Sequence, residues 1–372
     1  MNPPILFPTH SETQVLRREV VFEGSLRLPF PDQLDLELPS RVDIGTCVGK
    51  FKNDLRLLAP LPGLLSQDQN FLSLRWEGRV PKTSSFQPVR LGLKELREKT
   101  EGGGLVNLED GIKPLHIQLT PEITNIGISP FLRHRDGREY INCFTEQILE
   151  AFFDTLRHAF PKAQIWDMTR RFPEDFKEPM GLPEMFWSIA LGQDIKEVKE
   201  KMESMRLLYI GPETLFHWIQ SLFFDTPFTK RKVSVFLIQN SGHLQPQRHE
   251  YQLSNGQSYA PIVREFGELF PFCSFNSLFE GGSIMETNML ENNRIWEEGD
   301  LYLFANGKVK ARELPCIECG DCNSICPTNA NPLGLANSQF GKFSKVSCLE
   351  CGLCTFYCPS GINLRERIQN AS

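Results

Sequence analysis

The sequence predicts a multidomain α+β protein: an N-terminal β-sandwich or barrel, a central α/β (Rossmann-like) layer, a small β-grasp-like unit and a C-terminal helical, cysteine-rich module. Three observations predict this order. Short strand-like runs fill the first hundred residues, strands alternate with helices in the next stretch, and eight of the eleven cysteines lie between Cys316 and Cys358. A length of 372 residues is consistent with two or three domains.

The first predicted domain, residues 15–90, consists of short strands separated by turn residues. Pro60 and Pro62-Gly63 interrupt the apolar runs, as tight turns do. Short strands at this spacing are typical of a small all-β sandwich or barrel. The expected strands are Val20–Leu28, Leu34–Leu38, Val42–Phe51, Arg56–Leu65 and Phe71–Trp76.

The second predicted domain, residues 91–240, alternates strands and helices. It opens with a helix, Leu91–Lys99, that ends at Gly102-Gly103-Gly104. Phe144, Ile148, Phe152 and Leu156 then recur every four residues, which is a helical apolar face. Strands are expected at Leu115–Leu119, Ile123–Ile128, Ala163–Trp166, Leu207–Ile210 and Val233–Ile238, helices at Ile195–Met205 and Glu213–Phe224, and an irregular segment at Phe172–Pro183.

Residues 241–310 carry less helix signal and are expected to form the β-grasp-like unit. Asn255-Gly256 is a strong turn dipeptide, so a hairpin is predicted within Tyr251–Ala260. A short amphipathic helix, Ile262–Phe270, and a strand, Leu301–Phe304, follow. Residues 311–372 form the cysteine module, in which a short helix is expected between the two cysteine motifs, in the segment that includes Asn331–Leu335 and Leu335–Phe343.

Composition and charge exclude several classes of function. The chain is 40% hydrophobic and 23% charged, as globular proteins are, and its net charge of −6 offers no general basic surface for nucleic acid. The N-terminus lacks a basic segment followed by an apolar one, so no signal peptide is expected. The longest apolar runs, such as Met185–Leu191 and Leu215–Phe224, are shorter than the roughly 18–20 residues that span a bilayer. We therefore expect a soluble chain in a reducing cytoplasm that reaches a membrane only through partners.

The cysteine module contains the motif C-x2-C-x2-C-x3-C-P twice, which is the spacing of two-cluster bacterial-type ferredoxins. In that arrangement three cysteines of one motif surround a [4Fe–4S] cluster, and the fourth belongs to the other cluster. Gly320 and Gly352 follow the second cysteine of each motif and allow a tight turn. The expected ligands are Cys316, Cys319, Cys322 and Cys358 for cluster 1, and Cys326, Cys348, Cys351 and Cys354 for cluster 2.

Two structural zinc sites are the alternative interpretation of these cysteines. Zinc also takes four thiolates, but its usual knuckles are pairs of cysteines rather than a run of three with a separate Cys-Pro. The spacing favours iron–sulfur clusters. Cys47, Cys143 and Cys273 have no partner at ligand spacing and are expected to be structural.

From Leu93 to Leu364 the order of features resembles the peripheral C subunit of the Rnf complex, a membrane-bound, redox-driven ion pump. It is more distantly similar to the A subunit of sodium-pumping NADH:quinone reductase. The resemblance implies an N-terminal sandwich, a glycine-rich flavin or NADH loop, a β-grasp unit and the two-cluster module. It rests on the helix and glycine loop with Pro114–Leu119, on Ile128–Leu132, on Val233–Gly256 with Glu280–Met285, and on the cysteine motifs with Ile362 and Leu364.

The glycine loop departs from the family pattern. Glu109 and Asp110 stand where the family has glycines, and negative charge there would repel a flavin or nucleotide phosphate. The acidic pair that the family carries before Pro-aromatic-Leu is replaced by Ile128-Ser129. Gly102, Gly103 and Gly104 either form a remnant of the FMN or NADH site or simply stop a helix. We expect no tight binding of FMN or NADH.

The other polar residues suggest no catalytic site. There is no Ser–His–Asp or Cys–His constellation, Lys196–Lys201 is expected to be a solvated helix face, and Lys230-Arg231-Lys232 a basic surface cluster. The histidines that lack metal-ligand spacing are His116, His134, His158, His217, His243 and His249.

The sequence therefore predicts an iron–sulfur electron-transfer subunit of an oxidoreductase or translocase complex rather than a complete enzyme. The resemblance implies a place on the cytoplasmic face of the inner membrane. Expected partners are membrane-embedded and other subunits and a redox protein as donor or acceptor, but no nucleic acid. A soluble ferredoxin-type subunit of another oxidoreductase, and a non-redox scaffold stabilised by its clusters, are the alternatives.

Overall fold

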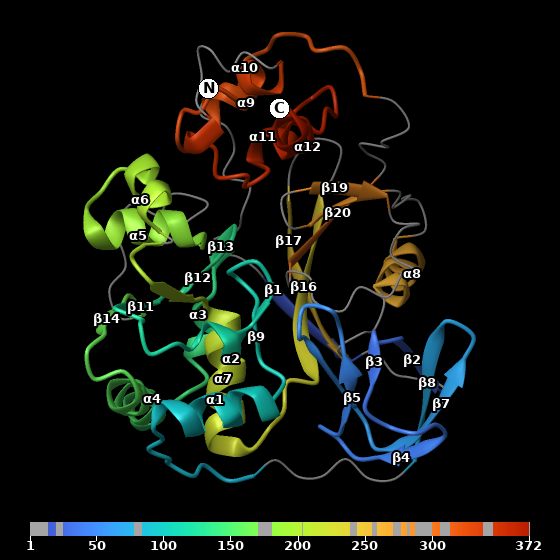
Figure 1. Cartoon of the computed structure of the whole chain (residues 1–372). Helices are drawn as coiled ribbons and strands as arrows, with labels where there is room; N and C mark the ends of the chain where they lie inside the picture. The colour runs from blue at the N-terminus through green and yellow to red at the C-terminus, as the bar shows by residue number, and fades with distance from the viewer. Residues whose placement is uncertain are drawn as a thin grey trace.

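The computed structural model shows a mixed α and β protein with several small sheets and a C-terminal helical module (Figure 1). It describes residues 14–19, 25–77, 84–169, 181–202, 204–238, 244–254, 259–270, 277–280, 283–286, 300–305, 313–337 and 345–371. No helix among these residues is long and apolar enough to span a bilayer.

Two small antiparallel sheets share one core near the N-terminus. Leu28, Val48, Leu57, Leu65 and Leu72 come from both sheets and are fully buried together. The strand expected at Phe71–Trp76 is confirmed, whereas Val42–Phe51 and Arg56–Leu65 each divide at a turn. The first sheet has the order β2 (Ser25–Pro29), β8 (Phe71–Trp76), β7 (Gly63–Asp68) and β4 (Ser40–Val42), and the second β3 (Gln33–Leu34), β5 (Cys47–Lys50) and β6 (Arg56–Leu58).

The first strand, β1 (Gln14–Glu19), belongs to neither of these sheets. It pairs in parallel with β17 (Leu244–Ser254), with Gln14 opposite Gln247. The predicted N-terminal boundary at residue 15 is therefore wrong for β1, which joins a sheet formed by residues more than two hundred positions later in the chain.

The α/β layer is built on a parallel sheet with the order β14 (Gln164–Asp167), β11 (Asn125–Ile128) and β15 (Leu207–Ile210). The strand that comes first in sequence lies in the middle, so the two crossovers run in opposite directions and the carboxyl ends of all three strands meet at one edge. The strands predicted at Ile123–Ile128, Ala163–Trp166 and Leu207–Ile210 are confirmed. Four predicted helices are confirmed as well: α1 (Leu93–Gly102), α4 (Glu146–Ala159), α6 (Ile195–Lys201) and α7 (Pro212–Phe224).

One predicted strand of this layer is a helix. Residues Leu115–Gln118 form α2, after the short strands β9 (Val106–Asn107) and β10 (Lys113–Pro114). Leu115 and Leu119 are buried and Ile117 is 45% exposed, so the apolar spacing is four residues rather than two. The remaining elements are β12 (Phe131–Leu132), β13 (Arg135–Asp136), α3 (Arg138–Ile141), α5 (Pro183–Leu191) and α6 (Ile195–Lys201).

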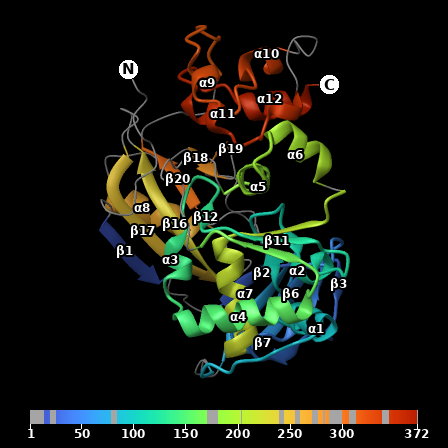
Figure 2. The same cartoon turned by 90° about the vertical axis from the view of Figure 1, so that its left-hand side faces the viewer.

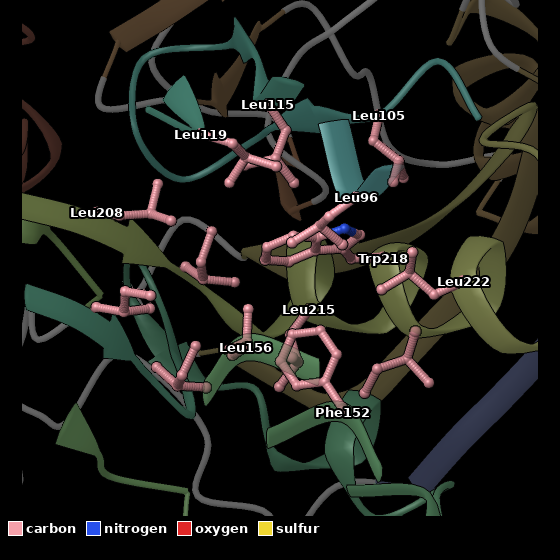
Figure 3. Packing of buried hydrophobic residues seen from close by; sticks show 14 of the residues in the cluster. Leu96, Leu105, Leu115, Leu119, Phe152, Leu156, Leu208, Leu215, Trp218 and Leu222 are labelled. Carbon is pink, nitrogen blue, oxygen red and sulfur yellow. The ribbon is translucent and has the colours of Figure 1, made fainter. Parts of the chain in front are cut away.

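The largest core joins α1 (Leu93–Gly102), α4 and α7 (Figure 3). Leu96, Phe152 and Trp218 are fully buried there, and the Trp218 indole N–H donates to the Thr100 hydroxyl over 3.0 Å. A tryptophan whose polar atom is satisfied fixes both the spacing and the rotation of the helices around it. This core holds α7 rigidly behind the parallel sheet.

A six-stranded mixed sheet lies beside the α/β layer, with the order β1, β17, β16 (Lys230–Ile238), β20 (Asp300–Phe304), β18 (Ser277–Glu280) and β19 (Ser283–Glu286). The helix α8 (Ala260–Leu269) covers one face through Ile262 and Phe266. The strand Val233–Ile238, predicted in the α/β layer, is central in this sheet, so the predicted boundary at residue 240 is wrong. The antiparallel partner of β17 is β16, and Asn255-Gly256 lies outside the described residues.

The C-terminal module sits across the α/β layer and the six-stranded sheet (Figures 1 and 2). Its helices are α9 (Asp321–Ser324), α10 (Pro332–Ala336), α11 (Leu353–Tyr357) and α12 (Leu364–Asn370). The short helix expected between the two motifs is α10; residues 338–344 lie outside the described part of the chain.

Candidate metal centre

The two cysteine motifs form the same backbone twice. Glu318 and Gly320 have φ angles of 55° and 80°, and the corresponding Glu350 and Gly352 have 53° and 82°. In each motif the residues on either side of the second cysteine have left-handed backbone conformations, which bend the chain into a loop. The glycine is then the N-cap of a helix, α9 in the first motif and α11 in the second. The sequence repeat is therefore a structural repeat of two ligand loops.

Backbone N–H groups point at sulfur atoms in both loops. The N–H of Glu318 lies 3.4 Å from the Cys316 sulfur, and the N–H of Glu350 lies 3.4 Å from the Cys348 sulfur. The N–H of Ala330 lies 3.3 Å from the sulfur of Cys326. Such contacts stabilise thiolates and are among the features that set the potentials of iron–sulfur clusters.

In the structure, cysteines of one motif lie next to cysteines of the other. One cavity is lined by Cys316, Cys319 and Cys322 of the first motif and by Cys358 of the second. Conversely, Cys326 packs with Cys348 against the same apolar side chains. Each group of four therefore combines three cysteines of one motif with the last cysteine of the other.

Two cysteines of the second group, Cys351 and Cys354, are buried, and Cys326 and Cys348 are partly buried. Burial, followed by the nearby Cys348 and Cys326, raises the pKa of the Cys351 thiol to about 11. Burial, followed by the nearby Cys351 and Cys348, also raises the pKa of the Cys354 thiol. Thiols gathered in a low-dielectric site ionise readily only when a metal takes the negative charge.

These features fit a [4Fe–4S] cluster at each group. Within the described residues no three His, Cys, Asp or Glu side chains converge closely enough to hold a single metal ion. A cubane does not require convergence on one point, because each of its four irons takes one thiolate.

The two loops are fastened to each other by hydrogen bonds. The N–H of Leu314 donates to the carbonyl of Ser360 over 3.0 Å, and the Ser360 hydroxyl donates to the carbonyl of Pro315 over 3.0 Å. The Thr328 hydroxyl donates to the carbonyl of Ser347 over 2.6 Å. The two ligand groups are thus held in one small unit.

Two side chains of the α/β layer reach the second loop. A ring nitrogen of His134 lies 3.0 Å from the carbonyl oxygen of Cys351, and burial lowers the pKa of His134 to about 3, so the ring is neutral. The Lys199 ammonium, on α6, donates to the carbonyl of Cys348 over 2.6 Å. Sequence reasoning missed both, since it treated His134 as scattered and Lys199 as solvated.

Apolar packing fixes the module on the six-stranded sheet. Phe356 of α11 lies 5.7 Å from Phe304 and 6.2 Å from Tyr302, measured between ring centroids. Leu349 and Leu353 of the second loop are buried in the same cluster. The second ligand group is therefore the one that faces the body of the protein, whereas Cys316 and Cys319 of the first are exposed.

The glycine loop packs against the protein itself. A side chain at Gly103 would lie 2.2 Å from the Ser221 hydroxyl, and one at Gly104 would lie 2.6 Å from Leu58; Gly104 also has a φ of 63°. Gly102 is the exposed end of α1. The lack of side chains at Gly103 and Gly104 serves close packing and a helix stop.

Glu109 caps the amino terminus of α7. Its carboxylate accepts hydrogen bonds from the N–H of Glu213 at 2.9 Å and of Thr214 at 3.3 Å, and from the Thr214 hydroxyl. Burial and then the nearby Glu213 raise the pKa of Glu109 to about 7. The amino terminus of a helix that follows a parallel strand is the usual phosphate site, and here a carboxyl group of the protein fills it.

A small cavity adjoins Glu109 at the same edge of the sheet. It is lined in part by Glu109, Glu213, His134 and Tyr302 and has a volume of about 30 Å³. That volume is far below the roughly 300–1,000 Å³ of pockets that hold small-molecule ligands.

The remaining residues singled out from the sequence take structural roles. Cys47 donates to Asp35 and Cys143 to the carbonyl of Tyr140, while Cys273 and His243 lie outside the described residues. The predicted surface position of Arg231 is wrong, since Arg231 is 4% exposed and paired with Glu213.

Comparison with known proteins identifies the C-terminal module. Residues 308–362 match the family described as 4Fe-4S dicluster domain. No curated protein matches the chain. Among solved structures, the chain is similar to one described as an NAD+-reducing [NiFe]-hydrogenase in the air-oxidized state, with 10% sequence identity and a TM-score of 0.40. The match covers 75% of this chain and 60% of that one.

Proposed function

We propose that the chain is the iron–sulfur electron-transfer subunit of a membrane-bound, ion-translocating oxidoreductase of the Rnf type. The observation that carries the electron-transfer function is the pair of ligand loops with matching backbone, which form two groups of cysteines that each combine both motifs, within a matched dicluster domain. The membrane context rests on the order of units along the chain, which resembles the Rnf C subunit.

The proposed ligands are Cys316, Cys319, Cys322 and Cys358 for cluster 1, and Cys326, Cys348, Cys351 and Cys354 for cluster 2. When bound, each cluster supplies one-electron chemistry at the potential that its surroundings set. The chain holds the thiolates, donates N–H groups to their sulfurs and shields the second group against the sheet.

The two groups differ in access, which suggests their roles. Cys316 and Cys319 are exposed beside Leu314 and Ile317, which are 59% and 67% exposed. The second group contacts His134 and Lys199 of the body. We propose that cluster 1 exchanges electrons with a partner redox protein and that cluster 2 lies on the side of the electron path that faces the body of the protein.

Affinity purification of the tagged chain from gently solubilised membranes of its host tests whether the chain belongs to a membrane-bound complex. Recovery of membrane-embedded subunits together with the chain supports the Rnf-like complex. Recovery of a soluble dehydrogenase instead would establish the alternative, a ferredoxin-type subunit of another oxidoreductase. Clusters that cannot be reduced would contradict both and leave a cluster-stabilised scaffold.

A further inference from the structure

The two ligand loops are a matched pair whose electrostatic surroundings differ. Glu318 of the first loop has its counterpart in Glu350 of the second, with nearly the same φ angle. Asp321, exposed in the first loop, corresponds to the buried Leu353 in the second. The ammonium of Lys199 contacts the second loop, 2.6 Å from the carbonyl oxygen of Cys348.

We propose that Lys199 is a positioning residue that raises the reduction potential of cluster 2. The proposal rests on the proposed function, since it requires [4Fe–4S] clusters at both ligand groups. Reduction adds one negative charge to a cluster, and a fixed cation nearby stabilises the reduced state more than the oxidised state.

The placement of Lys199 makes this effect specific to one cluster. Its ammonium is hydrogen-bonded to the backbone of a ligand residue, and its side chain is half-buried, so salt screens its charge less than that of an exposed lysine. The carboxylate of Glu350 in the same loop accepts a hydrogen bond from Gln369 over 2.6 Å and acts in the opposite direction. Arg133, whose charge favours the thiolate of Cys351, acts in the same direction as Lys199.

A higher potential at cluster 2 has a consequence for the path of the electron. A rise in the potential of cluster 2 favours transfer of an electron from the exposed first loop to the cluster that faces the body. Lys199 comes from α6 of the α/β layer, so the body of the protein, and not only the ferredoxin-like module, contributes to this preference.

The decisive experiment is a potentiometric titration of the anaerobically reconstituted full chain, followed by electron paramagnetic resonance. Lys199→Gln keeps a hydrogen-bond donor for the Cys348 carbonyl and removes the charge, Lys199→Arg keeps the charge, and Lys199→Met removes both. Lys201→Met is the matched control, because Lys201 lies on the same helix, is exposed and pairs with Glu197.

The equilibrium constant for reducing cluster 2 is expected to fall about tenfold in Lys199→Gln, as for a unit charge roughly 10 Å away at an effective dielectric constant of about 20. Tenfold corresponds to 59 mV for one electron. In Lys199→Gln the potential of cluster 1 is expected to stay at its wild-type value. Both clusters keep their wild-type potentials in Lys201→Met, and cluster 2 keeps its wild-type potential in Lys199→Arg.

An unchanged potential of cluster 2 in Lys199→Gln would overturn the proposal. An equal decrease of that potential in Lys199→Gln and in Lys199→Arg would also overturn it, because the contact would then be purely structural. Lys199→Met provides the same test of charge if the glutamine variant loads poorly. Absence of iron and sulfide from the wild-type protein would instead refute the proposed function itself.

Discussion

The carboxylate of Glu109 lies 2.9 Å from the backbone nitrogen of Glu213, in the first turn of α7. Through this contact and those to Thr214, the protein caps the amino terminus of α7 with its own acidic group. The partial positive charge of a helix amino terminus is then satisfied internally. The amino terminus of α7 follows a parallel strand, as phosphate sites at helix amino termini often do, but here the carboxyl group of Glu109 occupies it.

We therefore expect the cluster-loaded protein to bind neither FMN nor NADH in the micromolar range. An ionised Glu109 about 4 Å from a phosphate costs roughly 1–4 kcal/mol, which is about one to three powers of ten in affinity. Equilibrium titration monitored by fluorescence measures the dissociation constants. Micromolar binding that is abolished by substitution of Gly103 or Gly104 would contradict this and restore an Rnf-like flavin or nucleotide site.

Glu109 also makes stability depend on pH. Because the pKa of Glu109 is raised from 4.5 to about 7, the folded protein keeps a proton that the unfolded chain loses. The free energy of unfolding is therefore expected to decrease as pH rises from about 4.5 to 7, by up to about 3 kcal/mol, and to level off above 7. Glu213, whose pKa burial also raises, adds in the same direction.

Melting curves of wild type, Glu109→Gln and Asp110→Asn at pH 5, 6, 7 and 8 measure this dependence. Glu109→Gln should flatten it, and Asp110→Asn should retain it, because Asp110 lies in the same loop but contacts Gln118 and Lys113 rather than the amino terminus of α7. A wild-type melting temperature that rises steadily over this range would contradict the expected sign.

The buried pair of Arg231 and Glu213 predicts a large effect on stability. Replacing Arg231 by Met leaves the Glu213 carboxylate buried without its cation, 3.3 Å from where the guanidinium lay. Breaking such a pair costs about 3–5 kcal/mol. Chemical denaturation compares Arg231→Met with Lys230→Met, which removes a half-buried lysine next to it and should change stability by less than about 1 kcal/mol. Equal losses in the two variants would argue against the pair.

The crossed arrangement of cysteines predicts which signals disappear together. Cys326→Ala should perturb cluster 2, as Cys354→Ala does, because Cys326 packs with Cys348 rather than with its own triplet. Cys358→Ala should instead match Cys316→Ala, since both residues line the other cavity. Paramagnetic resonance of the four reduced variants checks the pairing. Pairing of Cys326 with Cys316 would show that each motif closes on itself.

Local sequence patterns predict the positions of helices and strands better than they predict which strands pair with each other. The four-residue apolar spacing correctly located α4, and α7 was predicted to within one residue of its first position. The same argument failed at Leu115–Gln118, where a short apolar segment fits a strand or a helix equally well. Strand pairing was missed for β1 and β16, because nothing local in Gln14–Glu19 encodes a partner beyond residue 240.

The candidate site divides in the same way. The ligand loops could be predicted from the cysteine spacing and the two glycines, because the geometry of each loop is determined within about a dozen consecutive residues. Lys199 and His134 could not be found from the sequence, since they reach the second loop only through the packing of the α/β layer on the module. The sequence predicts a surface position for Arg231, because a run of three basic residues does not reveal the buried Glu213 opposite it.

The most direct test of the central claim is the iron, acid-labile sulfide and zinc content of the anaerobically purified protein, measured per chain on a sample whose reduced spectrum is also recorded. Two [4Fe–4S] clusters require about eight irons and eight sulfides, with paramagnetic signals that appear on one-electron reduction. Zinc in place of iron, or about four irons per chain, would contradict the account.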